Sequence, residues 1–261
     1  MNGTGGVEVV RHLKGRAGAG REKRELAKEE PLVIHLTGGP SFTIMRTPGH
    51  DRELAAGFLL AEGLIGAAGD ITGLTGVPDV TNEIRVTLAE RPAGAVTRNL
   101  AVLSSCGLCG RPDPAALADG IPAVAGDFRV PPEVLYEVPG RVRARQELFR
   151  RTGATHAAAL FDAKGEIAAL FEDLGRHNAL DKLIGHALLA GLDAANHGAF
   201  LSGRVSFEMV VKAARAGIGL VAAVSAPTDA AVRLATRFGI TLAGFVRGEE
   251  VTVYTFPERI G

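Results

Sequence analysis

The sequence of 261 residues predicts an α/β protein whose C-terminal half holds a mainly parallel sheet. From Thr155 onward, short apolar segments typical of strands alternate with amphipathic segments typical of helices, and the connections between them are short. Strand–helix–strand units of this kind form right-handed crossovers and parallel sheets. The composition, 46% hydrophobic and 22% charged, is that of a globular chain, and the length fits one elaborate domain or two modest ones.

The N-terminal region divides into an arm and a small α+β unit. Residues 1–30 are rich in glycine and charge without sustained periodicity, so we expect a flexible basic and acidic arm. Asp51 is the expected cap of a helix whose apolar residues keep helical spacing as far as Ile65. Four segments of apolar or alternating character are expected to be strands, at 32–36, 41–46, 83–88 and 95–103.

A connection rich in proline and glycine follows, from Cys106 to Pro139, and its weak periodicity predicts a long loop with a short helix at most. We place the domain boundary here, which gives an N-terminal domain over residues 31–140 and a second domain over 141–261. Residues 141–151 hold five arginines and one glutamate, which is typical of the solvated face of a helix.

The second domain carries the regular α/β pattern. The helix expected over 178–190 places its leucines and Ile184 on one face, and two further helices are expected at 207–216 and 229–238. The expected strands lie at 156–161, 166–171, 199–202, 220–225, 241–246 and 251–255.

Charge and composition exclude several classes of protein. Lys+Arg and Asp+Glu both number 29, so no general attraction to nucleic acid or anionic membrane is expected, and any anion site must be local. The longest apolar stretch, Ala216 to Val224, is too short to span a membrane. The charged N-terminus has no apolar core of a signal peptide, and only two cysteines occur. We therefore expect a cytoplasmic protein without a disulfide framework.

Three loops of the second domain predict a binding site for phosphate. In parallel sheets, ligands bind where strands end and helices begin, because helix N-termini offer unpaired N–H groups and partial positive charge. The loops at Ser202-Gly203-Arg204, at Ser225 to Thr228 and at residues 244–248 follow three such strands. The alternative is that the hydroxyls cap helices and that the arginines are merely solvated.

The segment from Glu172 to Asn178 is a further candidate. Arg176 and Asn178 could hold an anionic or hydroxyl-rich ligand while His177 transfers protons, or the segment could simply cap a helix. His177 and Asp181 have the spacing of a metal pair, but no third ligand with matching spacing is evident, so no metal site is predicted.

The two cysteines, Cys106 and Cys109, are separated by Gly107 and Leu108. Such a pair could be half of a zinc site, a redox dithiol, a nucleophile with a resolving thiol, or a carrier of sulfane sulfur. Zinc would require two subunits to pool their pairs, since the chain has no other cysteine. A deaminase-type site needs a His-x-Glu ahead of the cysteines, whereas His156 follows them. The neighbouring glycines predict a mobile loop, which favours the carrier.

Several segments, taken in order, resemble the FdhD/NarQ family of sulfurtransferases required for active formate dehydrogenase. The most specific is the run Gly175-Arg176-His177-Asn178-Ala179-Leu180-Asp181-Lys182. The other matching segments are 47–49, 53–63, 106–110, 155–158, 172–174, 202–204, 225–228, 244–247 and 253–255. The resemblance covers nearly the whole chain from about Pro31.

This resemblance implies a function, a fold and partners. Cys106 would accept sulfur from a cysteine desulfurase as a persulfide, assisted by Cys109. The sulfur would pass to molybdenum bis(molybdopterin guanine dinucleotide), bound as substrate, before the cofactor enters the formate dehydrogenase apoenzyme. GDP would mimic part of that cofactor. The implied fold is a cytidine-deaminase-like three-layer α/β/α sandwich with a smaller N-terminal α+β domain, as a homodimer.

The resemblance and the three loops together assign the cofactor-binding residues. The implied segment near the C-terminus is Phe245, Val246, Arg247, Gly248, Glu249 and Glu250. The three loops add Ser202, Gly203, Arg204, Ser225 and Thr228, and the segment from Glu172 to Asn178 adds Arg176, His177 and Asn178. The alternative function is a non-catalytic cofactor chaperone whose cysteines are structural or bridge zinc.

Overall fold

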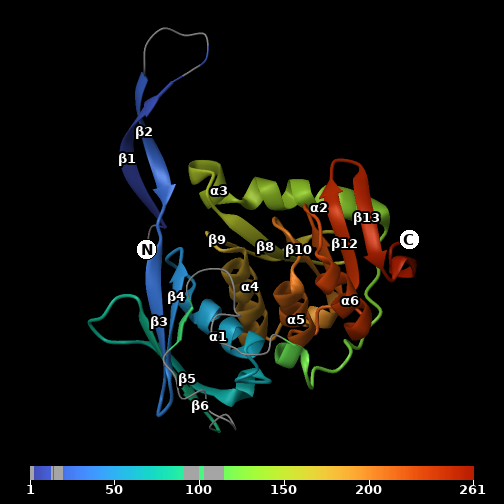
Figure 1. The fold of residues 1–261 in the computed structure, drawn as a ribbon, viewed down its shortest axis with the longest axis horizontal. Coiled ribbons are helices and arrows are strands. Elements are labelled where there is room, and N and C mark those ends of the chain that lie inside the picture. The colour runs from blue at the N-terminus through green and yellow to red at the C-terminus, as the bar shows by residue number, and fades with distance from the viewer. Residues whose placement is uncertain (1–2, 13, 15–19, 91–99, 103–114) are drawn as a thin grey trace.

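Two mixed β-sheets and a separate two-stranded ribbon organise the protein in the computed structural model, which describes residues 3–12, 14, 20–90, 100–102 and 115–261 (Figure 1). The strands are β1 (Thr4–Arg11), β2 (Gly20–Ala27), β3 (Glu30–Leu36), β4 (Ser41–Arg46), β5 (Ile71–Gly76), β6 (Glu83–Leu88), β7 (Leu100–Val102), β8 (His156–Phe161), β9 (Ile167–Asp173), β10 (Gly198–Leu201), β11 (Leu220–Ala223), β12 (Thr241–Arg247) and β13 (Glu250–Thr255). The α-helices are α1 (Asp51–Ala61), α2 (Pro132–Arg145), α3 (Glu147–Thr152), α4 (Arg176–Ala190), α5 (Phe207–Arg215) and α6 (Asp229–Phe238). Short 3₁₀ turns lie at Ala68–Asp70, Ala115–Ala118, Ala194–Asn196 and Pro257–Arg259.

The sheet of the C-terminal half has the strand order β13-β12-β11-β10-β8-β9. Only β10, β11 and β12 are joined by parallel pairing; the other three pairs are antiparallel. The expectation of a mainly parallel sheet is therefore wrong. The reason is local, because tight turns join β8 to β9 and β12 to β13, and a hairpin forces antiparallel pairing.

Helices cover both faces of this sheet, so the C-terminal half has three layers (Figure 1). Alternate residues of β8 point to opposite faces: Ala159 packs in one cluster with Leu135 of α2, and Leu160 packs in the other with Leu183 of α4. Because both faces are buried, the strands are nearly continuous apolar runs. The result is the mixed α/β fold that the sequence predicts.

The second sheet, ordered β5-β6-β3-β4-β7, packs its apolar face on α1. Phe42 of β4 meets Phe58 of α1 with ring centroids 5.2 Å apart. Helix α1 begins at Asp51 as expected, but Asp51 is not its cap. Its carboxylate instead accepts hydrogen bonds from Nε and Nη2 of Arg46 at 2.8 and 3.0 Å, and the Arg46 side chain is only 1% exposed. A buried guanidinium requires that partner.

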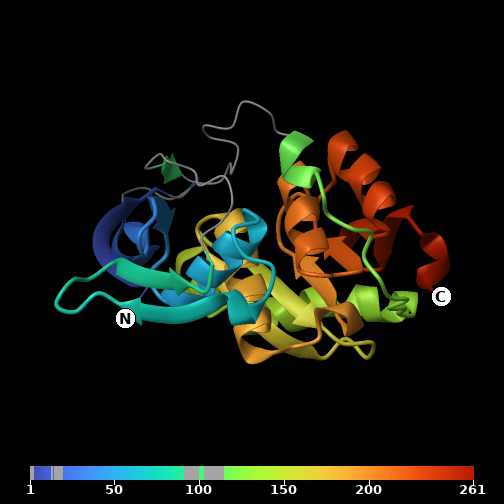
Figure 2. The ribbon, with the colours of Figure 1, turned by 90° about the horizontal axis from the view of Figure 1, so that it is seen from below.

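Helices α1 and α4 join the two sheets through direct backbone contact (Figure 2). A Cβ at Gly57 would lie 1.9 Å from the Asp181 carbonyl oxygen, and one at Gly185 would lie 1.8 Å from that of Glu53. One continuous hydrophobic core consequently runs from β3 through α1 and α4 to β8. The boundary expected between residues 140 and 141 falls inside α2, a helix that packs on the six-stranded sheet.

The N-terminal segment contains regular structure where a loose arm was expected. β1 and β2 pair antiparallel in full register, from Thr4 opposite Ala27 to Arg11 opposite Gly20. The register places Glu8 opposite Lys23, and opposite charges facing each other across strands stabilise such pairs. In Figure 1 this ribbon extends away from both sheets beside α3. No helix in the described part of the chain is long and apolar enough to cross a bilayer.

The contact between α1 and α4 predicts the effect of a single methyl group. Gly185→Ala should lower the free energy of unfolding by about 2 kcal/mol or more, because the new Cβ meets a backbone carbonyl that cannot move freely. Gly140→Ala in α2 is the matched control, since its Cβ would meet nothing within 4 Å. We expect the control to be neutral, or to stabilise by up to about 1 kcal/mol through helix propensity. Equal urea midpoints for the two variants would contradict the proposed contact.

Candidate functional site

The candidate site lies along one edge of the six-stranded sheet. The parallel strands β10, β11 and β12 end there, and α5 and α6 begin just after β10 and β11. β9 runs in the same direction and leads into the N-terminus of α4. Three helix N-termini therefore face one sheet edge, which concentrates unpaired N–H groups and positive dipole ends there.

Backbone hydrogen bonds tie the three predicted loops together at this edge. Val205 N donates to the Ala226 carbonyl at 3.3 Å, and Thr228 N donates back to the Val205 carbonyl at 2.9 Å. Phe245 N donates to the Ser225 carbonyl at 3.3 Å, which links the β11 loop to β12. The loops that the sequence identified separately are one contiguous surface, which we call the three-loop edge: residues 202–205, 225–228 and 244–245.

The third member of the three-loop edge is the end of β12 with a bulge: the strand expected at 241–246 is present and continues to Arg247, into the segment 244–248 that was also expected to be a loop. The pairing of β12 with β13 shifts register between Gly244 and Arg247, and Phe245 has a φ of 53°. A non-glycine residue with positive φ is strained and is frequently found at functional sites. Gly244 permits the close approach, because a Cβ there would lie 2.9 Å from Pro227 Cδ and 3.1 Å from the Ser225 carbonyl oxygen.

A polar cluster joins the first loop to the starts of β8 and α4. Ser202 Oγ accepts a hydrogen bond from Ala157 N at 2.8 Å and lies 3.3 Å from His156 Nδ1. A Cβ on Gly203 would be 3.3 Å from His156 Nδ1 and 3.5 Å from Arg176 Cδ. His156, which the sequence reasoning did not assign to the site, is thus one of its central members. No sequence pattern marks it, because His156 reaches Ser202 only when β8 pairs antiparallel with β10.

His156 also lines a cavity of about 520 Å³ next to this cluster. The cavity is bounded by Pro139, Arg143, Gln146, Phe149, Gly153, Ala154, Thr155, His156, Phe200, Ser202 and Val224. Partial burial lowers the pKa of His156, and the nearby cations Arg176 and Arg204 lower it further. The imidazole is therefore neutral near pH 7, and it can accept a proton or a hydrogen bond from a ligand in the cavity.

His177 is buried at the interface between α4 and α5. Its Nε2 lies 2.6 Å from Glu208 Oε2, and burial lowers its pKa. Because a carboxylate only accepts, Nε2 carries the proton and the buried Nδ1 is left as an acceptor. Three polar atoms at the starts of α4 and α5 make no hydrogen bond to any described residue: Arg176 Nε, His177 Nδ1 and Ser206 Oγ. Unsatisfied buried groups of this kind indicate a functional role or a bound ligand.

Asp181, one helical turn after His177 on α4, also has a charged partner within the protein. Lys212 Nζ donates to both carboxylate oxygens of Asp181 at 2.5 and 2.7 Å, and burial raises the pKa of Asp181 although Lys212 opposes the shift. His177 and Asp181 thus face Glu208 and Lys212, one helical turn apart. Among the described residues no group of three or more His, Cys, Asp or Glu side chains is arranged to hold a metal ion.

Asn178 serves the architecture instead of the edge. Its amide donates to the Met45 carbonyl at 2.8 Å and to Asp173 Oδ1 at 3.0 Å. Asp173 is fully buried and forms an ion pair with Lys182 at 2.8 Å. Lys182 in turn donates to the Thr47 carbonyl at 2.9 Å. Both amide donors of Asn178 are used in this network, which leaves its Oδ1 for a ligand, so the binding role of Asn178 stays a prediction.

The remaining predicted residues have different environments. Thr228 Oγ1 caps α6 by accepting from Ala231 N at 3.2 Å, which is the helix-capping alternative. Val246 is fully buried in the cluster with α2, so its side chain cannot reach a ligand. Four exposed residues form the tip of the β12–β13 hairpin: Arg247, Gly248, Glu249 and Glu250. Cys106 and Cys109 lie outside the described residues.

Known proteins are similar to this chain along nearly its whole length. The model of the FdhD/NarQ family matches residues 27–261. A protein of Thermoplasma acidophilum named Sulfur carrier protein FdhD is 41% identical over 99% of this chain and 94% of its own length. A protein of the same name from Streptomyces avermitilis is 44% identical over 90% of this chain and 88% of its own. The crystal structure of a formate dehydrogenase accessory protein from Desulfotalea psychrophila is similar with a TM-score of 0.79 at 26% identity, covering 99% of both chains.

The buried histidines predict how stability depends on pH. His156 and His177 both have pKa values below the ordinary value of 6.5, so the unfolded chain binds more protons than the folded one in the window just below pH 6.5. The free energy of unfolding should therefore fall as the pH is lowered from about 7 to about 5. His156→Gln should reduce that fall by up to about 1 kcal/mol, because His156 is only partly buried.

The matched control is His197→Gln, which alters a histidine just before β10, at the opposite edge of the sheet. Urea unfolding at a series of pH values measures the effect. If the free energy of unfolding changed with pH in the same way for wild type and His156→Gln, His156 would titrate alike in the folded and unfolded states. That result would contradict the partly buried environment described for it.

Proposed function

This chain belongs to the FdhD/NarQ family, and we propose that it carries sulfur as a persulfide on Cys106 and delivers it to a guanine-dinucleotide molybdenum cofactor. The observation that carries the proposal is the match to the family model over residues 27–261. Relatives of this chain are named as sulfur carriers. The sulfur donor would be a cysteine desulfurase, and the recipient of the sulfurated cofactor a formate dehydrogenase apoenzyme. The chain would act as a cytoplasmic homodimer with a cytidine-deaminase-like C-terminal domain.

The three-loop edge supports the binding of a guanine dinucleotide. Its diphosphate would lie against the backbone N–H groups at the starts of α5 and α6, where the helix dipoles favour negative charge. Arg204 is exposed beside the first loop, and Arg176 has a buried Nε without a protein partner. His177 Nδ1 is an unpaired acceptor, and the N–H groups of a guanine base are donors of the kind it requires. The bound cofactor is substrate here, and its molybdenum receives the sulfur.

Loading of Cys106 is a thiol exchange that needs no external oxidant. The Cys106 thiolate attacks the terminal sulfur of a persulfide on the desulfurase. The S–S bond to the desulfurase cysteine breaks, that cysteine leaves as a thiolate, and a new S–S bond forms on Cys106 Sγ. The sulfur keeps its oxidation state throughout.

Delivery requires two electrons, because the carried sulfur is at oxidation state zero and reaches molybdenum as sulfide. The two cysteines supply one electron each when the Cys109 thiolate attacks Cys106 Sγ. A Cys106–Cys109 disulfide forms, the terminal sulfur leaves as hydrosulfide toward the metal, and a cellular thiol reductant later restores both cysteines. In this scheme Cys106 is essential for loading, whereas Cys109 acts only in delivery.

Sulfur loading separates this function from that of a cofactor chaperone with structural or zinc-bridging cysteines. Incubation of the wild type with a cysteine desulfurase and cysteine should add the mass of one sulfur atom, removable by a thiol reductant. Cys109→Ser, the matched control, should still load, and Cys106→Ser should not. Intact-mass spectrometry reads both results. Loading of Cys106→Ser, or stoichiometric zinc in protein purified without chelator, would refute the assignment of the carrier.

Binding of GDP tests the three-loop edge. At a hundredfold excess over its Kd, GDP should raise the Tm by about 5 °C, because a ligand that binds only the folded state stabilises it. Arg204→Gln should weaken GDP about tenfold and so reduce that rise by about half. Arg52→Gln removes an arginine on α1 that is also exposed and should leave the rise unchanged. No rise in the wild type would refute GDP binding, and equal rises in both variants would place the nucleotide elsewhere.

A further inference from the structure

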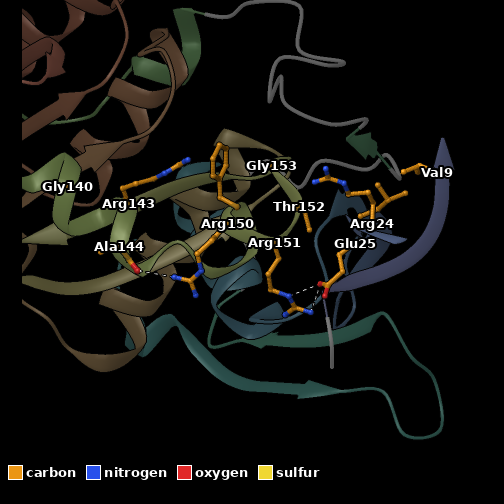
Figure 3. Close-up of a pocket in the computed structure, with 12 residues that line it drawn as sticks. Val9, Arg24, Glu25, Gly140, Arg143, Ala144, Arg150, Arg151, Thr152 and Gly153 are labelled. Carbon is orange, nitrogen blue, oxygen red and sulfur yellow. Dashed lines mark hydrogen bonds and ion pairs between the residues drawn. The ribbon is translucent and has the colours of Figure 1, made fainter. Parts of the chain in front are cut away.

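A second cavity, larger than the one beside His156, lies between the β1–β2 ribbon and helices α2 and α3 (Figure 3). Its volume is about 820 Å³, within the range of pockets that hold small organic ligands. We call it the arginine groove, after Arg24, Arg143, Arg150 and Arg151. The other lining residues are Val9, Glu25, Leu26, Gly140, Ala144, Phe149, Thr152 and Gly153.

The lining of the arginine groove is strongly basic. Four arginines face the single carboxylate of Glu25, in a chain whose formal net charge is zero. Arg151 is held by Glu25 at 2.6 Å, by Thr4 Oγ1 at 2.9 Å and by Glu147 at 3.8 Å. Arg24 pairs with Glu22 at 2.8 Å. These two arginines are largely neutralised within the protein.

Arg143 and Arg150 differ, because neither makes an ion pair with a described residue. The Arg143 guanidinium stacks 4.0 Å from the ring centroid of Phe149, which orients it without neutralising its charge. Arg150 makes one long hydrogen bond, 3.4 Å, to the Ala144 carbonyl. Figure 3 shows both on the helical side of the groove, opposite Arg24 and Glu25 on the ribbon. Two planar guanidinium groups that have no ion-pair partner in the described part of the chain, and that line one cavity, are suited to bidentate contacts with phosphate oxygens.

Apolar side chains complete the walls of the groove. Val9 and Leu26 line the ribbon side, Phe149 lines the helical side, and Leu26 is 52% exposed. The volume exceeds what an inorganic anion fills, so an organic group attached to the phosphates can cover this apolar surface. All four lining residues of the ribbon lie before residue 27, where the match to the family model begins.

From these observations we propose that the arginine groove is a second anion site, which binds an organic diphosphate through Arg143 and Arg150. The site is distinct from the three-loop edge, and neither the sulfur transfer nor the GDP site proposed above depends on it. The two cavities are nevertheless neighbours, since Arg143, Phe149 and Gly153 line both. The ligand's diphosphate lies across the two guanidinium groups, and its organic part lies on the ribbon.

The test is calorimetric titration of the full chain with ADP, which carries the diphosphate without the guanine base. The double variant Arg143→Gln/Arg150→Gln should bind ADP at least about tenfold more weakly than wild type, since each lost bidentate contact is charge-assisted. The matched control, Arg52→Gln/Arg233→Gln, removes the same charge from exposed sites on α1 and α6 and should bind ADP like wild type. Inorganic pyrophosphate should bind more weakly than ADP, because it leaves the apolar wall uncovered.

Three outcomes would overturn the proposal. They are absence of ADP binding to wild type, equal ADP affinity in wild type and the groove variant, and tighter binding of pyrophosphate or of a glutamate-rich peptide than of ADP. Sulfur loading of the groove variant should match wild type, and GDP should still raise its Tm because the three-loop edge is intact, so a failure here is distinguishable from a failure of the proposed function. A groove variant with the wild-type urea midpoint confirms that the comparison is between folded proteins.

Discussion

Backbone hydrogen bonds join three loops at one edge of the six-stranded sheet, and the rest of this structure depends on that constraint. Val205 exchanges hydrogen bonds with Ala226 and Thr228, and Phe245 adds the third loop through Ser225. These bonds use some main-chain groups of the loops and hold the starts of α5 and α6 side by side. The loops therefore form a preformed surface that a ligand can meet without ordering them first.

The rigidity of that edge comes from the way the two halves of the chain are fused. The buried Asp173, at the end of β9, accepts from Thr47 N at 3.0 Å and pairs with Lys182, which returns to the Thr47 carbonyl. The glycine contact between α1 and α4 lies nearby, at Asp181. Charged groups this deeply buried are costly to separate from their partners, so the network fixes the segment that presents Arg176 and His177.

Sequence periodicity predicted most helices and strands, because both faces of the large sheet are buried and its strands are short apolar runs. It could not predict partners far apart in the chain. The polar segment from Glu172 to Asn178 indicated a binding loop, yet Asp173 and Asn178, together with Lys182, hold residues 45–47 in place. The paired ribbon was missed because polar strands without a buried face lack a hydrophobic period. His156 became recognisable only when the fold brought it to Ser202.

The central claim is that this edge is a guanine nucleotide site in a sulfur carrier, and a crystal structure of the chain with GDP tests it most directly. The account predicts the diphosphate within hydrogen-bonding distance of backbone N–H groups in the loops at 202–205 and 225–228, with the N–H groups of the base toward His177 Nδ1. A GDP molecule whose diphosphate touches none of the three loops would contradict it.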